Sequence, residues 1–151
     1  MLEFVHAALG GAIAYKIGSP ALALPLALGS HFVLDLLPHW NPSLTKEKKF
    51  KGKISSKTKI IIFSDCLIGL ILGLKIACLA LPDLNKAFLV ILGCFMGILP
   101  DLAEAPYFFL NKKTPFLKFL VNFQSGHQYN VSFVWGISFQ ILLVILLFSF
   151  L

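Results

Sequence analysis

Five long apolar segments, separated by short turns or lysine-rich loops, constrain the fold of this chain more than any other feature. They occupy residues 2–17, 20–37, 58–81, 85–110 and 129–151. A membrane-spanning helix needs about 20 mainly apolar residues. Hydrophobic residues make up 58% of the 151 positions, against about 45–50% in a typical soluble domain. The sequence therefore predicts an all-α, polytopic membrane protein in which residues 1–151 form one bundle of about five transmembrane helices.

The positive charges of the chain predict its orientation. All 13 basic residues are lysines, and most of them fall in two loops, at about residues 41–57 and 111–128. Positively charged loops face the cytoplasm. We therefore expect a multi-pass protein of the cell (inner) membrane, with both loops and the N-terminus in the cytoplasm. The TPFLKFLVNF stretch of the second loop is amphipathic and suits the membrane surface.

Composition also narrows the classes of partner. The net charge of +6 arises beside apolar segments, where lysines meet anionic lipid headgroups. No soluble module with an aromatic platform for bases is present, so we expect membrane lipid and no nucleic acid as a partner. The three cysteines stand singly and indicate neither a disulfide nor a thiolate metal site. Glycines such as Gly10 and Gly11 allow close helix contacts, so an oligomer packed through its glycines is a further alternative.

The stretch SHFVLDLLPHWN carries His31, Asp35 and His39, spaced by four residues. Residues four apart share one face of an α-helix. Pro38 disfavours helix just before it, so His31 and Asp35 form the firm pair. His39 is expected at the helix exit, as a second-shell, interfacial or substrate-facing residue. A charged residue in hydrocarbon costs about 2.5–3.5 kcal/mol on insertion scales, which makes such residues functional candidates.

The expected topology brings many ionisable side chains to one depth near the cytoplasmic face. They are His6, His31, Asp35, His39, Asp65, Asp101, Glu104 and His127. The assignment of orientation used only the lysines, so this agreement independently supports a single site. The alternative for His31 and Asp35 is a buried hydrogen-bonded pair that joins helices.

Histidine nitrogens and carboxylate oxygens without thiolates suit Zn, Mn or Fe. His31 and Asp35 can bind one ion from one helix face, and Asp101 and Glu104, three residues apart, can converge likewise. The fourth segment contains Pro100 beside Asp101, and a kink or break there can expose backbone groups to a polar cavity. We expect a divalent metal, Zn or Mn, as the cofactor.

Two carboxylates are candidates for proton transfer. Glu104 is the predicted general base, and Asp65 is the second catalytic candidate. A helix cap, or a pair with Lys59, is the alternative role for Asp65.

These motifs resemble those of a prokaryotic family of small membrane-bound metal-dependent hydrolases, which includes a LexA-regulated inner-membrane protein. The resemblance covers VHAALGGA at His6, the Gly-Ser-His-x-x-x-Asp-x-x-Pro element at His31 and Asp35, Gly-x-Leu-Pro-Asp at Asp101, and His127 before the last segment. It implies a metal-binding helical bundle and hydrolysis. Shared depth and this resemblance together assign these five residues as metal ligands. In the family, Leu-Pro-Asp precedes the His-x-x-x-Asp element and a histidine pair occurs where this chain has only His127.

A second resemblance is weaker. Ser125, Gly126 and His127 are similar to the Ser-Gly-His of lipid phosphatases of the phosphatidic acid type. Those enzymes hold phosphate with arginines, whose planar fork matches its oxygens. This chain has no arginine, and its motifs occur in the other order.

The sequence as a whole predicts a metal-dependent hydrolase acting on an ester or phosphoester of a lipid or amphiphilic substrate at the cytoplasmic membrane face. Two other classes stay open. The same residues suit a divalent-metal or proton transporter, and a non-catalytic structural membrane protein would also bury them.

Overall fold

The computed structural model describes residues 1–151 and consists of seven α-helices. These are α1 (Glu3–Ile17), α2 (Pro20–Asp35), α3 (Leu44–Lys51), α4 (Ser56–Leu79), α5 (Leu84–Phe109), α6 (Pro115–His127) and α7 (Phe133–Ser149). An isolated parallel bridge joins His39 to Asn130, and there are no strands. The prediction of an all-α fold is confirmed.

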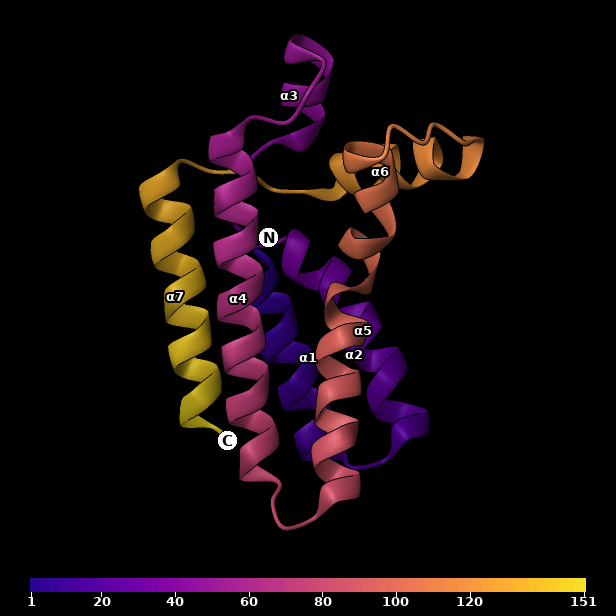
Figure 1. Ribbon diagram of the computed structural model, residues 1–151. Helices are drawn as coiled ribbons and strands as arrows, with labels where there is room; N and C mark the ends of the chain where they lie inside the picture. Colours follow the sequence, from indigo (N-terminus) through magenta and orange to yellow (C-terminus); the bar gives the residue numbers. More distant parts are fainter.

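The first helix is the centre of the bundle. α1 packs against α2, α4, α5 and α7. α7 lies beside α4 in the view of Figure 1, and its Leu147 packs on the core cluster that contains Ile76 of α4. α3 and α6 lie across the end of the bundle near which the chain begins (Figure 1). Each of the five apolar segments thus forms one helix, and both lysine-rich loops add a helix of their own.

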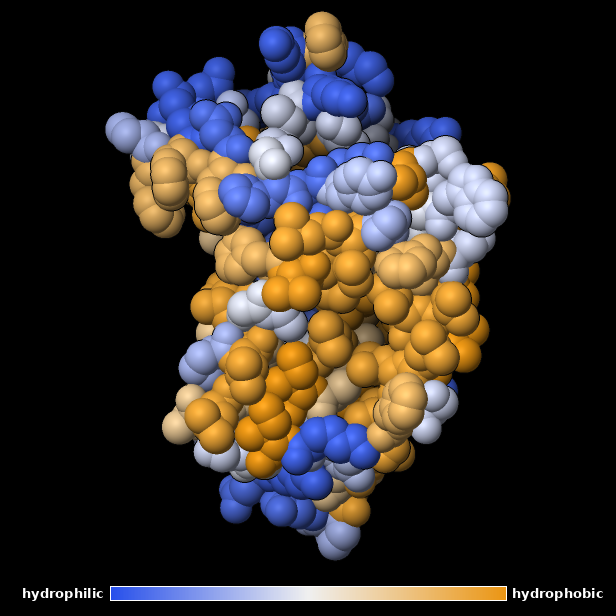
Figure 2. Space-filling model, turned by 180° about the vertical axis from the view of Figure 1, so that it is seen from behind, coloured by the Kyte–Doolittle hydropathy of each residue, from blue (hydrophilic) through white to orange (hydrophobic).

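Two of the helices, α4 and α5, are long and apolar enough to cross a membrane. At 1.5 Å per residue they measure about 36 and 39 Å, more than the hydrocarbon core of about 30 Å. α2 and α7 are apolar but shorter, with 16 and 17 residues. Figure 2 shows apolar side chains over the middle of the molecule and hydrophilic ones gathered at its two ends. The number of spans stays a prediction.

Prolines shape the two helices that carry the candidate ligands. α2 ends at Asp35, two residues before the predicted end. Pro38 disfavours the helical conformation in the residue before it, so the chain leaves the helix just ahead of the proline. α5 continues through Pro100 and Pro106 to its end at Phe109, so, of the expected kink or break, the break does not occur. Each proline removes a single backbone N–H, and the packing of α5 against α1 and α2 keeps the flanking turns helical.

The lysine-rich segment is anchored to the bundle. Ser43 accepts a hydrogen bond from the Lys46 amide at the start of α3, and Gly52, with φ of 70°, ends this helix. The Lys48 ammonium donates to the Phe108 carbonyl oxygen at 2.9 Å. A cation that binds the last carbonyls of a helix stabilises that terminus. α3 is therefore held over the end of α5.

The expected amphipathic stretch forms α6. Thr114 caps its start by accepting a hydrogen bond from the Leu117 amide. Leu117, Val121 and Gln124 are buried, whereas Phe119 is exposed. One face of α6 therefore packs on the bundle and the other is free.

Glycines let α1 and α5 touch backbone to backbone. A Cβ atom on Gly10 or on Gly93 would overlap the carbonyl group of the other, and one on Gly97 would overlap the carbonyl of His6. Small residues at helix crossings permit this approach, and van der Waals contact then stabilises the pair. The crossing fixes where His6 lies relative to α5.

We predict that Gly93→Ala destabilises the protein by about 1–3 kcal/mol, because the added methyl group overfills the α1/α5 crossing. Gly29→Ala is the matched control: no atom lies within 4 Å of the added group, and alanine favours helix. Thermal unfolding in detergent measures both. An unchanged midpoint for Gly93→Ala would contradict the close crossing.

Candidate metal centre

Two buried histidines from different helices stack at the centre of the site. His6 on α1 and His31 on α2 have ring centroids 4.0 Å apart at 21° and are fully buried. Asp101 on α5 completes the group: one candidate ligand atom from each of the three residues lies within 4.8 Å of the others. Three helices thus place two imidazoles and a carboxylate around one point.

Hydrogen bonding fixes the tautomer of His31. Its Nδ1–H donates to the Gly97 carbonyl oxygen at 2.9 Å, because a carbonyl can only accept. Its Nε2 lies 3.3 Å from Oε1 of Gln124, an oxygen that can only accept a hydrogen bond, and it also faces oxygens of Asp35 at 3.6 Å and Asp101 at 3.8 Å. Three acceptor oxygens around one nitrogen favour positive charge at this point, carried either by a proton on Nε2 or by a metal ion.

The surroundings of the His6 ring are those that best fit a bound metal ion. Both of its ring nitrogens are buried and have no hydrogen-bond partner. Its Nε2 lies 3.4 Å from Oδ1 of Asp35, close enough for attraction but not aligned as a hydrogen bond. A buried polar group without a partner costs about 1–3 kcal/mol. Two imidazoles with carboxylates form a donor set that Zn²⁺ or Mn²⁺ accepts.

Asp35 lies between the histidines at the end of α2. Its side chain is 3% exposed and is paired with the α-ammonium group of Met1. The Nε2 atoms of His6, His31 and His39 lie 3.4, 3.6 and 3.9 Å from its oxygens. One carboxylate therefore contacts all three buried imidazoles.

His39 is fully buried although it follows the helix. Its Nδ1–H donates to the Leu37 carbonyl oxygen at 2.8 Å, and its Nε2 has no hydrogen-bond partner. Burial lowers the pKa of His39 below its ordinary 6.5, because it disfavours the charged ring. Backbone hydrogen bonds to Tyr129 and Val131 hold it beside Asp35. Its second-shell or substrate-facing role stays a prediction.

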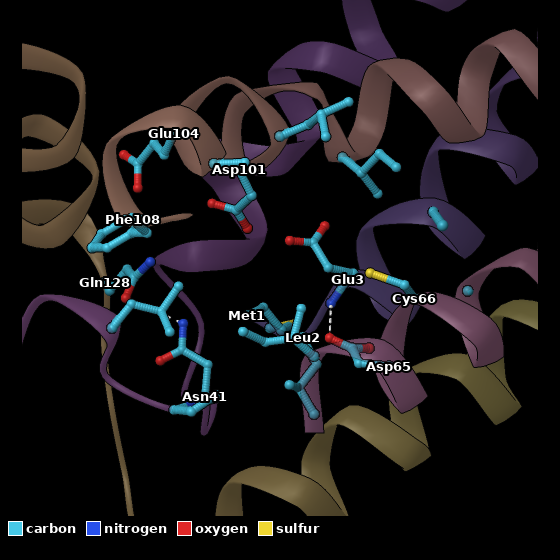
Figure 3. Close-up of a pocket in the computed structure, with 18 of the residues that line it drawn as sticks. Met1, Leu2, Glu3, Asn41, Asp65, Cys66, Asp101, Glu104, Phe108 and Gln128 are labelled. Carbon is cyan, nitrogen blue, oxygen red and sulfur yellow. Dashed lines mark hydrogen bonds between the residues drawn. The ribbon is translucent and has the colours of Figure 1, made fainter. Parts of the chain in front are cut away.

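A cavity of about 860 Å³ opens beside this group and receives further carboxyl groups. Glu3 and Asp101 face each other across it, and Glu104 points into it from α5 (Figure 3). Glu104 is buried, and its Oε1 has no hydrogen-bond partner. A free carboxylate oxygen one helical turn from Asp101 suits the predicted general base. That role stays a prediction.

The structure places Asp65 at the start of α1. Its Oδ2 accepts a hydrogen bond from the Glu3 amide at 2.7 Å and its Oδ1 one from the Phe4 amide at 2.9 Å. These amides lack partners within the helix, and a carboxylate favours the positive end of the helix dipole. Asp65 therefore caps α1, one of the two alternatives, while its catalytic role stays a prediction.

His127 lies apart from the buried histidines. It is exposed at the end of α6, where its Nδ1–H donates to the Phe123 carbonyl oxygen at 2.7 Å. Its ring also packs on that of Phe123, with centroids 4.2 Å apart. The three-residue group does not include it, and its assignment as a ligand stays a prediction.

Two residues of the site were not expected from the sequence. Gln124 bridges the site from α6: its amide NH₂ donates to the Pro100 carbonyl oxygen at 3.1 Å, and its Oε1 faces His31. Its spacing from Leu117 and Val121 on one helix face is the signal that could have found it. Glu3 stands three residues before His6, a spacing that also puts both on one face.

Comparison with protein-family models, curated proteins and solved structures found no match. The assignment to the prokaryotic membrane-bound hydrolase family therefore stays a prediction.

Replacing Asp65 by alanine is expected to destabilise the protein by about 0.5–2 kcal/mol, as the loss of a helix cap does. Asp65→Asn keeps one acceptor oxygen, and its effect is expected to be smaller. Thermal unfolding of both variants in detergent measures the difference. If Asp65→Ala left the midpoint in place, the carboxylate would not be serving as a cap.

Proposed function

We propose that this chain is a membrane-embedded metal-dependent hydrolase. The observation that carries the proposal is the group of the buried His6 and His31 with the partly exposed Asp101, in which both ring nitrogens of His6 lack a hydrogen-bond partner. Buried polar side chains normally find hydrogen bonds. An unpartnered imidazole beside a second imidazole and carboxylates supports a bound divalent cation.

The proposal places five helices, α1, α2, α4, α5 and α7, across the cell (inner) membrane. The lengths of α4 and α5 and the apolar middle of the surface in Figure 2 support this arrangement. α1 and α2 are shorter, and α1 begins toward the end of the bundle at which the lysine-rich α3 lies (Figure 1). Positive charge there favours a cytoplasmic N-terminus.

His6, His31 and Asp101 would hold the ion, with Asp35 as a further ligand or the partner that orients the histidines. The donation of His31 Nδ1–H to Gly97 is the hydrogen bond that metal-binding histidines usually make through their second nitrogen. When bound, Zn²⁺ or Mn²⁺ acts as a Lewis acid that lowers the pKa of water and polarises an ester or phosphoester.

Glu104 would move the proton. Its free oxygen can accept a proton from water while the water oxygen forms a bond to the acyl carbon or phosphorus atom. The ester C–O or P–O bond then breaks, and Glu104 returns the proton to the leaving oxygen. Lys46, which lines the same cavity, can hold an anionic headgroup near the reacting bond.

The substrate class follows from the place of the site. The cavity is lined both by carboxylates and by apolar residues of α4 and α5, so it suits a molecule with a polar and an apolar part. We propose a lipid or another amphiphile with an ester or phosphoester bond. This activity and the membrane setting are those of the prokaryotic hydrolase family that the motifs resemble, to which we propose the chain belongs.

The variant Asp35→Asn should lower turnover by about 100-fold or more, because the amide cannot replace a carboxylate that contacts three imidazoles. Insertion into the membrane should be unaffected. Product release from phospholipid vesicles with added Zn²⁺ or Mn²⁺ measures the activity.

Asp83→Asn is the matched control, since Asp83 caps α5 through the Lys86 amide and asparagine caps helices equally well. Activity in Asp35→Asn equal to that of the wild type would remove the proposal.

A further inference from the structure

The cavity beside the candidate metal centre has a polar end and an apolar end. Glu3, Asp65, Asp101 and Glu104 line the first together with Lys46. The second runs between α4 and α5 and is here named the α4/α5 cleft. Its walls are Cys66, Leu70 and Gly73 of α4 and Cys94, Ile98 and Leu102 of α5.

We propose that the α4/α5 cleft holds one acyl chain of an anionic phospholipid, whose headgroup lies at the carboxylates and Lys46. This inference rests on the proposed function, because it orients the substrate of that same site. It goes further in naming the anchoring element: a single chain, bound between two particular helices.

The cleft is closed at one end, which limits the length of chain that it can hold. At its inner end the helices meet, because a Cβ atom on Gly73 would lie 3.0 Å from the sulfur of Cys94. From Ile91, near this closed end, to Asp101 there are ten residues of helix, or about 15 Å. The cleft is therefore a slot of limited depth that begins at the reacting groups.

The chemistry of the walls supports a hydrocarbon. The wall residues below the carboxylates carry no charge, and Leu70 and Leu102 are about half exposed, at 58% and 49%. Such side chains face the lipid phase when the two helices cross a membrane. A chain can thus enter sideways from the bilayer without leaving an apolar environment, while its headgroup stays at the polar end.

Lysines beside the polar end support an anionic lipid. Lys46 lines the cavity, and α3, which carries it and three further lysines, lies at this end of the bundle (Figure 1). Lysines at a membrane surface attract anionic headgroups. The four carboxyl groups of the cavity repel a phosphate unless the proposed ion lies among them, so the headgroup position between Lys46 and the candidate metal centre depends on that ion.

The test uses a phosphatidylglycerol that carries a photoreactive diazirine in one acyl chain. After illumination of the full-length protein in dodecyl maltoside, cross-linked residues are mapped by peptide mass spectrometry. We expect saturable labelling of α4 and α5 at the cleft walls, and competition by unlabelled phosphatidylglycerol.

Cys66→Phe should reduce this labelling by about tenfold or more, because a phenyl ring and a methylene chain cannot share one close-packed volume. Cys78→Phe is the matched control: it lies on the same helix, is exposed, and does not line the cleft. Ile98→Phe fills the opposite wall and serves if Cys66→Phe does not fold. Thermal midpoints report folding of all three.

Labelling spread evenly over the outer faces of the helices, or unchanged in folded Cys66→Phe and Ile98→Phe, would overturn the inference. The Asp35→Asn variant separates it from the proposed function. Labelling that persists in this variant and in wild-type protein without hydrolytic activity would leave the cleft in place and remove the hydrolase. Hydrolysis without labelling of the cleft would support the hydrolase and overturn the inference about the cleft.

Discussion

The close contact between α1 and α5 at Gly97 determines the geometry of the candidate metal centre. The backbone of His6 lies directly against Gly97, where any Cβ atom would overlap its carbonyl group. The Gly97 carbonyl oxygen in turn accepts the Nδ1–H of His31 from α2. One glycine therefore sets the separation of two helices and orients the side chain of a third. The stacking of the two imidazoles, which no local sequence rule requires, follows from this contact.

The site gathers polar groups at buried positions. His6, His31 and Asp35 are almost fully buried, and Nε2 of His31 faces three oxygens. Such an arrangement is costly in a medium of low dielectric constant unless positive charge lies among the acceptors. The Met1 α-ammonium group paired with Asp35 supplies part of that charge, and the proposed divalent cation would supply the rest and give the nitrogens of His6 a partner. Asp101 belongs to this group and also lines the cavity, so it would contact both the proposed ion and a substrate in the cavity.

Spacing rules predicted what lies within one helix. The i, i+4 relation of His31 and Asp35 and the expected exit of the chain at Pro38 both describe α2 well. The hydropathy pattern likewise located five of the seven helices, because long apolar runs are a signal that needs no tertiary information. Of the kink or break expected at the prolines of α5, the break does not occur, since packing against neighbouring helices outweighs the loss of two hydrogen bonds.

Contacts between segments far apart in the chain could not be predicted from the sequence. Asp65 caps α1 through amides more than 60 residues away, and sequence alone left this role level with others. Gln124 enters the site only because α6 folds back over α5, which the loop composition did not indicate. His127 ends α6 with its ring turned to the carbonyl of Phe123, so its nearness to the last helix in sequence did not bring it to the buried group.

Metal content is the most direct test of the central claim. The detergent-purified wild type and a His6→Ala variant are to be compared by elemental mass spectrometry after incubation with Zn²⁺ or Mn²⁺ and removal of free ions. Thermal unfolding verifies that the variant is folded. The buried group predicts stoichiometric metal in the wild type and its loss in the variant. A folded wild-type protein that retains no metal under these conditions would contradict the account.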